Sequence, residues 1–423
     1  MTSDSALEAQ MLAIGHRARA AASLLRDAPA RVRTIAIAAI ARAIRETKKN
    51  ILAANAEDVA RTNPGNAATN ARIDRLRLDS DRLDAIIASV ETIANQPDPV
   101  GVVMEEWTRP NGLHFQRVRT PLGVVGMIFE SRPNVAAEAS VLALRSGNAI
   151  ILRGGSESIQ SVTALGEAIR NTLAASALPA DAVQIVPSTD RAAVGMMLAG
   201  LNGAIDVIVP RGGKSLVARV QAEARAPVLA HLEGVCHTYV HAAARPDRAI
   251  ALALNAKMRR VSVCGATETL LLDRAIAPSL LPMIAAALRK RGCELRGDDE
   301  ARAIADMDQA TELDWRTEYL APVLAIRVVS GIDQAIMHIA EYGSQHTDCI
   351  VTEDANAAER FLREVDSAIV LHNASTQFAD GGEFGFGGEI GIATGRLHAR
   401  GPVGAEQLTT FKYVVRGAGQ TRL

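Results

Sequence analysis

Residues 121–135, Pro121-Leu-Gly-Val-Val-Gly-Met-Ile-Phe-Glu-Ser-Arg-Pro-Asn-Val135, mark the point where the pattern of the chain changes. From Leu122 onward, short apolar runs alternate with segments of helical length. Strands are expected at 124–128, 149–152, 183–186, 206–209 and 239–240, and helices near 135–145, 157–175, 190–200 and 215–224. Such alternation is typical of a parallel sheet covered by helices on both faces. Sheets of this kind bind ligands at the carboxyl ends of their strands.

The residues before this region are predicted to form helices followed by a hairpin. Apolar residues repeat at helical spacing over Leu83–Ile93, and Ser80 stands where a helix N-cap belongs. Strand-like segments at 102–109 and 113–119 flank an Asn-Gly pair, which favours a hairpin turn. We interpret this hairpin as an arm that projects from the body of the protein.

A second α/β pattern begins near Ala249. It starts with a helix that ends at Arg259, and its expected strands are 269–272, 323–329, 349–352 and 369–371. Residues 407–415 end the chain as a further predicted strand. The sequence therefore predicts an α/β fold with two parallel-sheet domains and a small β arm.

Length and composition limit the functions to consider. A chain of 423 residues is too long for one compact core, so two or three domains are expected. With 46 basic and 47 acidic residues, the net charge of −1 argues against nucleic acid or an anionic membrane as the main partner. No apolar run reaches the roughly 18 residues that cross a bilayer, and residues 1–10 lack the pattern of a signal peptide.

The cysteines Cys236, Cys264, Cys293 and Cys349 show no C-x-x-C spacing, and free thiols in a reducing compartment are expected. Cys264 is the candidate nucleophile. Three cations stand within the seven residues before it, and two small residues follow it. Nearby cations and backbone N–H groups lower the pKa of a thiol. A buried structural cysteine is the alternative that these local features leave open.

Two glycine-containing turns follow predicted strands: Arg153-Gly-Gly-Ser-Glu157 and Arg211-Gly-Gly-Lys-Ser215. Each opens a helix whose N–H groups suit phosphate oxygens, so together they favour a dinucleotide site. Singly, each turn is also compatible with ordinary βα turn chemistry. The second turn is not a Walker motif, because Ile208 stands where the first glycine is required.

The segment 231–241 contains three histidines and a cysteine, and so suggests a metal. Read as a strand, it places Cys236 on the face opposite His237 and His241, and no further ligand is spaced convincingly. We therefore expect no resident metal. Zinc at these histidines is kept as an alternative.

Six segments carry a shared pattern: 121–135, 146–157, 255–264, 318–323, 341–347 and 388–402. Together they resemble the gamma-glutamyl phosphate reductases (glutamate-5-semialdehyde dehydrogenases), a branch of the aldehyde dehydrogenase superfamily. The segments run in the family's order from Pro121 to the C-terminus. The phrase Glu130-Ser-Arg-Pro-Asn134 separates this branch from ordinary aldehyde dehydrogenases.

The resemblance implies an aldehyde dehydrogenase-like fold with three parts. A cofactor-binding domain would comprise 1–104 and 121–240, with 373–400 returning to it. A catalytic domain, 241–372, would carry Cys264. Residues 105–120 and 401–423 would form an oligomerisation arm.

The resemblance also implies a reaction. The chain would reduce L-glutamyl 5-phosphate to L-glutamate 5-semialdehyde with NADPH in L-proline biosynthesis, through a Cys264 thioester and with release of phosphate. The implied cofactor contacts are Arg153, Ser156, Gly212, Gly213 and Glu318. The implied substrate or oxyanion contacts are Glu130, Ser131, Arg132 and Asn134, with Asn134 acting in catalysis. Such a reductase would be a cytoplasmic homo-oligomer, with glutamate 5-kinase as a candidate partner.

Two positions depart from the family pattern. Val261 stands where proline is expected, and Gly265 stands where asparagine is expected directly after the cysteine. Three other functions stay open: a dehydrogenase that hydrolyses its thioester with Glu233 as base, an inactive NADP-binding or assembly protein, and a zinc enzyme on the histidines of 231–241.

Overall fold

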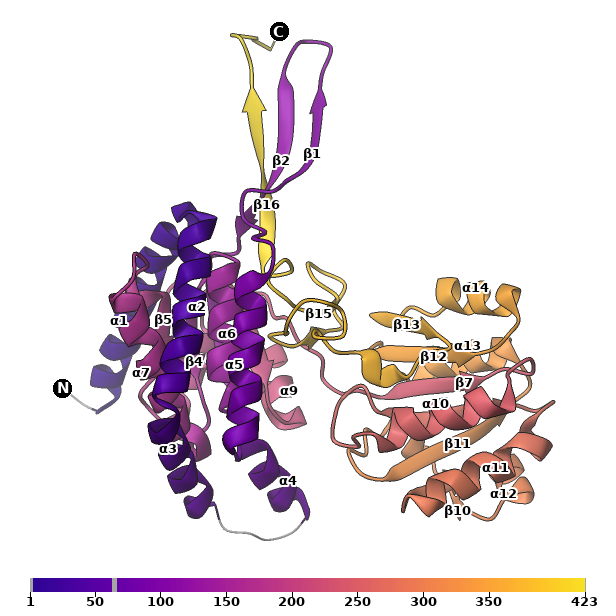
Figure 1. The fold of residues 1–423 in the computed structure, drawn as a ribbon. Coiled ribbons are helices and arrows are strands. Elements are labelled where there is room, and N and C mark those ends of the chain that lie inside the picture. The colour runs from indigo at the N-terminus through magenta and orange to yellow at the C-terminus, as the bar shows by residue number, and fades with distance from the viewer. Residues whose placement is uncertain (1–2, 63–66, 423) are drawn as a thin grey trace. The chain divides into compact units, whose positions relative to one another are not determined.

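The chain divides into two compact units in a computed structural model that describes residues 3–62 and 67–422 (Figure 1). The first unit comprises Met1–Ala230, Gly385–Gly391 and Val403–Leu423, and the second comprises His231–Phe384 and Ile392–Pro402. Residues 1, 2, 63–66 and 423, which fall within the predicted domain ranges, lie outside the described residues.

The first unit begins with the predicted helices. These are α1 (Ser3–Asp27), α2 (Ala30–Glu46), α3 (Lys48–Arg61), α4 (Ala67–Leu76) and α5 (Ser80–Asn95). Helix α5 buries Leu83 and Ile93 on one face, as their spacing predicts. Its N-cap is Asp79, whose side chain accepts from the backbone N–H of Arg82. The prediction of Ser80 as N-cap is therefore wrong by one residue, because the carboxylate before it already binds the N–H groups of the first turn.

A four-stranded parallel sheet forms the centre of the first unit, in the order β5-β4-β3-β6. Its strands are β3 (Val124–Phe129), β4 (Ala149–Arg153), β5 (Val183–Ile185) and β6 (Val207–Arg211). The helices between and after them are α6 (Asn134–Arg145), α7 (Ile159–Ala174), α8 (Arg191–Leu198) and α9 (Lys214–Glu223). Figure 1 shows α2, α5 and α6 side by side, and α6 packs on β4. Every residue of β3 is buried, which confirms the predicted covered sheet.

The largely buried carboxylate of Asp98 joins α2 and α6. Arg33 of α2 donates to Asp98 through Nε at 2.9 Å and Nη2 at 2.8 Å. Arg145 at the end of α6 lies 3.8 Å from the same carboxylate and donates to the backbone carbonyls of Ile93 and Ala94. Both arginine side chains are 2% exposed, so Asp98 neutralises two charges that water does not reach.

The predicted arm is a three-stranded antiparallel sheet that extends from the rest of the first unit (Figure 1). Strands β1 (Val103–Thr108) and β2 (His114–Pro121) form the hairpin, and β16 (Thr409–Arg416) pairs with β2. Trp107 stacks on Phe115 across the hairpin, with ring centroids 5.4 Å apart. Tyr413 of β16 meets the same indole edge-on. Cross-strand aromatic pairs of this kind hold the three strands in register.

A seven-stranded parallel sheet forms the second unit, in the order β10-β9-β11-β8-β7-β12-β13. Its strands are β7 (Cys236–Val240), β8 (Thr267–Asp273), β9 (Glu294–Gly297), β10 (Asp308–Gln309), β11 (Val323–Val329), β12 (Thr347–Val351) and β13 (Ile369–His372). Its helices are α10 (Pro246–Met258), α11 (Ala277–Lys290), α12 (Asp299–Ile304), α13 (Ile332–Tyr342) and α14 (Ala355–Glu364). The short pair β14 (Ile392–Ala393) and β15 (Gly401–Pro402) belongs to the same unit. Strands β9 and β10 were not among the predicted strands.

Strand β7 corrects one sequence-based interpretation. Residues 239–240 were expected in the first sheet, but β7 pairs with β8 and β12 in the second. Of residues 373–400, which were assigned to the cofactor domain, only Gly385–Gly391 belong to the first unit. The periodicity that predicts a strand does not say which strands it will pair with. No helix in the described ranges is both long enough and apolar enough to cross a membrane.

The shared carboxylate predicts a large stability effect. Substitution of Asp98 by Asn should lower the free energy of unfolding by about 3–5 kcal/mol, because two buried guanidinium groups lose their counter-charge. Urea unfolding followed by circular dichroism measures this loss. Asp27, whose carboxylate pairs with Arg26 at 72% exposure, is the matched control. Asp27→Asn should leave the unfolding midpoint unchanged. Equal effects of the two substitutions would contradict the assignment.

Candidate active site

Cys264 lies in the loop between α10 and the buried central strand β8. Three other loops enter the strands beside it: His231 precedes β7, Glu318 precedes β11 and His346 directly precedes β12. The four strands are neighbours in the order β11-β8-β7-β12 and run parallel. The four loops therefore reach the same edge of the sheet, at the amino ends of its strands.

Two imidazoles flank the thiol of Cys264. The sulfur and one ring nitrogen each of His231 and His346 all lie within 4.8 Å of one another. The two rings meet edge-on, with centroids 4.9 Å apart. Nδ1 of His231 lies 2.8 Å from the carbonyl oxygen of Ile392. Because a carbonyl oxygen only accepts, this nitrogen carries the proton, and Nε2 carries the lone pair when the ring is neutral.

The environment favours the thiolate form of Cys264. Burial alone would raise the pKa of the Cys264 thiol, but the imidazoles of His346 and His231 outweigh burial and hold this pKa well below its usual value. The pKa values of Cys236, Cys293 and Cys349 are instead raised by burial. Since the thiolate is the nucleophilic form, these pKa directions favour Cys264 as the candidate nucleophile among the four cysteines.

Close backbone packing positions the Cys264 loop. The Cys236 thiol donates to the carbonyl oxygen of Cys264 at 3.1 Å. A Cβ atom on Gly234 would lie only 2.2 Å from that carbonyl oxygen. The chain at Gly234 thus passes against the backbone of Cys264 in a way that only glycine permits.

Glu318 lies next to the nucleophile. Its pKa is raised, first by burial and then by the negative charge of Cys264, while a hydrogen bond from the backbone N–H of Gly234 opposes the rise. The structure therefore brings together two predicted site residues, Cys264 and Glu318, and adds the two histidines to them.

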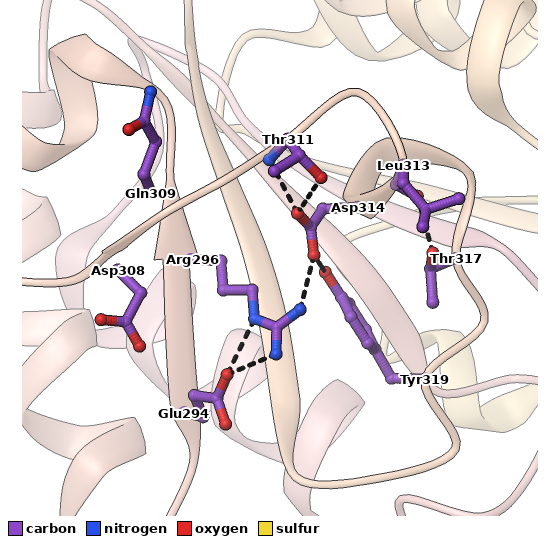
Figure 2. Close-up of a pocket in the computed structure, with 9 residues that line it drawn as sticks. All are labelled: Glu294, Arg296, Asp308, Gln309, Thr311, Leu313, Asp314, Thr317 and Tyr319. Carbon is purple, nitrogen blue, oxygen red and sulfur yellow. Dashed lines mark hydrogen bonds and ion pairs between the residues drawn. The ribbon is translucent and has the colours of Figure 1, made fainter.

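A hydrogen-bonded network supports the loop that carries Glu318 (Figure 2). The buried carboxylate of Asp314 accepts from both the backbone N–H and the hydroxyl of Thr311, each at 2.7 Å. Its other oxygen accepts from Arg296 at 2.8 Å and from the Tyr319 hydroxyl at 2.7 Å. Because Tyr319 directly follows Glu318, these bonds limit the positions that Glu318 can take.

A buried ion pair supports the other side of this loop. Lys257 of α10 and Glu268 of β8 form a hydrogen-bonded pair with both side chains 0% exposed. Glu268 also accepts from the backbone N–H of Leu320, whose φ of 52° lies in the left-handed region. The Lys257 ammonium lies 5.6 Å from the centroid of the Tyr319 ring. The pair thus connects the two ends of the Cys264 loop with the Glu318 loop.

The other predicted site residues belong to the first unit and follow three neighbouring strands, β4, β3 and β6. Arg153 ends β4, Ser156 starts the short turn after it, and Gly212 and Gly213 join β6 to α9. Glu130, Ser131, Arg132 and Asn134 follow β3. These residues lie at the carboxyl ends of the strands, where the sequence pattern places a ligand site.

The Glu130–Asn134 segment is held by carboxylates. Glu130 accepts from the backbone N–H of Gly213 at 3.0 Å, and a Cβ on Gly212 would lie 2.5 Å from the same oxygen. Ser131, at a φ of 47°, donates its N–H and its hydroxyl to Glu157 at 2.7 and 2.8 Å. The structure therefore places Glu130 at the helix N-terminus of the predicted dinucleotide turn. The Asn134 amide donates to Glu138 one helical turn later.

Arg153 fits an anionic group of a dinucleotide. Its guanidinium is 8% exposed and donates through Nη2 to the carbonyl of Thr189 at 2.9 Å. Its Nε is buried without a hydrogen-bond partner, and burial lowers the pKa of the group. A buried donor without a partner is costly, so a bound phosphate oxygen would remove this cost.

The histidines were assigned differently in the sequence analysis. His231 was considered for zinc together with His237 and His241, and His346 appeared only inside a matched segment. His237 and His241 instead bind Asp348 and Thr352. His346, 115 residues from His231, joins the site because β12 is the neighbour of β7. Only the strand order reveals this relation.

Gly265 allows a test of the packing around the nucleophile. A Cβ atom there would lie 2.9 Å from the carbonyl oxygen of Thr376 and 3.3 Å from Cβ of Ala379. Gly265→Ala should therefore displace the Cys264 loop, destabilise the protein by about 1–3 kcal/mol and lower turnover about tenfold to hundredfold. Thermal unfolding and steady-state kinetics measure the two effects. Gly395→Ala, at an open position of the same unit, should change neither. A Gly265→Ala protein with normal turnover would contradict this account.

Known proteins match the chain over nearly its whole length. The model of the aldehyde dehydrogenase family matches residues 2–304 and 300–414. A gamma-glutamyl phosphate reductase of Caulobacter vibrioides is 63% identical over 413 residues, covering 97% of this chain and 100% of the relative. One of Rhodospirillum rubrum is 58% identical, covering 97% and 96%. The crystal structure of gamma-glutamyl phosphate reductase from Thermotoga maritima is 43% identical with a TM-score of 0.93, covering 98% of this chain and 100% of that one. The chain belongs to the aldehyde dehydrogenase family.

Proposed function

We propose that this protein is an NADP-dependent acyl-phosphate reductase that converts L-glutamyl 5-phosphate to L-glutamate 5-semialdehyde in L-proline biosynthesis. The observation that carries the chemistry is the Cys264 thiolate between His231 and His346. The names of the full-length relatives support the choice of substrate.

The first step forms a thioester on the chain. The Cys264 thiolate attacks the acyl carbon, and the bond from that carbon to the phosphate oxygen breaks. Because phosphate leaves as a stable anion, this step needs no strong general acid. Nucleophilic catalysis replaces one difficult reaction by two easier ones. After the later hydride transfer, the negative oxygen reforms a carbonyl and the carbon–sulfur bond breaks to give the aldehyde. His231 and His346 stabilise the leaving sulfur as the thiolate.

The second step reduces the thioester. Bound NADPH supplies the hydride. The negative oxygen that develops on the acyl carbon needs hydrogen-bond donors, each worth about 3 kcal/mol in comparable sites. The resemblance of the Glu130–Asn134 segment assigns Asn134 to this role, and backbone N–H groups after Cys264 are further candidates. No water is consumed, so the reaction needs no base for hydrolysis at Glu233.

The residues that would hold the cofactor fit a phosphorylated dinucleotide. Arg153 has an unpaired buried Nε, and Gly212 and Gly213 lie at the start of α9, where the Gly213 N–H donates to Glu130. We assign the 2′-phosphate to Arg153, because a guanidinium matches phosphate geometry. Ser156 and, by the family resemblance, Glu318 are the other proposed cofactor contacts. Ser131 and Arg132 are the proposed substrate contacts, and the position of Glu130 next to Gly213 favours a role near the dinucleotide turn.

The cellular setting follows from the reaction. An enzyme that uses an acyl phosphate and NADPH acts where both are made, so we place it in the cytoplasm. The kinase that forms glutamyl 5-phosphate is a candidate partner. Exposed Met104 and Tyr413 on the arm support association with further copies of this chain.

The proposed reaction predicts that its reverse, the oxidation of the semialdehyde, depends on phosphate. Glutamate 5-semialdehyde should reduce NADP only when inorganic phosphate is present, because phosphate releases the acyl group from Cys264. Cys264→Ala should lower this rate about a thousandfold or more, and absorbance of NADPH measures it. Cys293→Ala, which removes a thiol of raised pKa, should keep normal activity. Activity without phosphate would instead indicate an oxidising dehydrogenase.

Arg153 predicts the choice of cofactor. Arg153→Ala should raise the KM for NADPH about tenfold to hundredfold, because a charge-assisted hydrogen bond is lost. The KM for NADH should stay nearly unchanged. Steady-state kinetics with both cofactors measure the ratio. Arg219→Ala, which removes an exposed cation from α9, is the matched control. An unchanged ratio in Arg153→Ala would refute the assignment.

A further inference from the structure

We propose that Cys264, His231 and His346 form a zinc site, and that zinc bound there blocks the nucleophile reversibly. Binding itself stands on the geometry of these three side chains. Inhibition rests on the proposed function, because it requires that Cys264 act as the nucleophile.

The donor atoms suit zinc in type and spacing. Thiolate sulfur and imidazole nitrogen are the ligands that zinc prefers, at about 2.3 and 2.0–2.1 Å. In a tetrahedral site such donors lie about 3.3–3.6 Å apart, which follows from these bond lengths. The three donor atoms already lie within 4.8 Å of one another. Closure by about 1 Å, within reach of side-chain rotation, therefore completes the set.

A second, independent observation at His346 points to a bound metal ion. The His346 side chain is 0% exposed, and its Nε2 is buried without a hydrogen-bond partner. Its Nδ1 lies 2.8 Å from the hydroxyl of Thr347. A buried ring nitrogen without a partner is costly unless something binds it, and a metal ion does so when Nδ1 carries the proton.

Both histidines have the outer hydrogen bonds typical of metal ligands. Ligating imidazoles donate their other N–H to a carboxylate, a backbone carbonyl or water, which fixes the tautomer. His231 donates from Nδ1 to the carbonyl of Ile392, which fixes its tautomer. Nδ1 of His346 lies beside the Thr347 hydroxyl, which accepts the Nδ1 proton when Nε2 binds the ion. Each imidazole can therefore offer Nε2 to the ion.

The set is selective and leaves one position open. One thiolate and two neutral imidazoles favour zinc over magnesium or calcium, which prefer oxygen ligands. Three protein ligands leave the fourth zinc position for water. Coordination uses the sulfur lone pair of the thiolate, which is the lone pair that would attack the acyl carbon. The zinc-bound protein therefore cannot form the thioester.

Two measurements on the full chain test the binding. The first titrates Zn²⁺ against a chromogenic chelator. We expect one equivalent per chain, and affinity at least about tenfold weaker in Cys264→Ser, His231→Gln and His346→Gln. The second uses Co²⁺, which should give a thiolate charge-transfer band that is absent in Cys264→Ser. Cys293→Ser and His372→Gln, outside the set, should bind both ions like the wild type.

A third measurement uses only the wild-type protein. It is needed because His346 is buried, so its substitution could weaken zinc binding by disturbing the fold. Zn²⁺ should protect Cys264 of the wild-type protein from iodoacetamide, and a chelator should restore alkylation, as peptide mass spectrometry shows. Failure of Zn²⁺ to bind, or binding that survives Cys264→Ser, would overturn the site. Zinc binding in a protein without reductase activity would refute the proposed function and leave the site standing. Full reductase activity with zinc bound would overturn the inhibition.

Discussion

The order of four neighbouring parallel strands, β11-β8-β7-β12, is the constraint on which the candidate active site depends. Parallel strands begin at one edge of a sheet, so the loops that enter them meet there. Glu318, Cys264, His231 and His346 lie in these four loops. The first unit uses the opposite edge: Arg153, Glu130 and Gly213 follow its strands, where helix N-termini attract anions. The candidate nucleophile thus lies at the amino ends of the strands in its sheet, and the proposed cofactor residues lie at the carboxyl ends of the strands in theirs.

Neighbouring charges keep the partly buried Cys264 in its thiolate form. Two imidazoles favour the Cys264 thiolate. Burial raises the pKa of Glu318, and the negative charge of this thiolate raises it further. Beneath them, Lys257 and Glu268 neutralise each other without water. Burial raises the pKa of Glu268 to about 7, although Lys257 opposes the rise. The thiolate that serves the reaction and the neutral imidazoles beside it are also zinc ligands, so a site of this reactivity is inherently sensitive to zinc.

Close backbone contacts hold this arrangement. Gly234 passes the Cys264 carbonyl, and Gly265 lies against the carbonyl of Thr376, with no room for a side chain at either position. The departure from the family pattern at Gly265 therefore agrees with its surroundings in this protein. Since a backbone atom moves less readily than a side-chain tip, these contacts define the position of the thiol more narrowly than hydrogen bonds alone.

The sequence by itself determined the fold class, both parallel sheets and the arm, because strand and helix periodicities are local features. The cations before Cys264 are local too, and they made it the candidate nucleophile. The sequence also placed Arg153 and Gly213 on turns that follow strands. Only the tertiary structure decided that β7 joins the second sheet and that His346 lies beside Cys264. Packing over the whole sheet decides which strands become neighbours, and no local sequence pattern contains this information. The pKa of a thiol in turn depends on the charged groups that this packing brings near it.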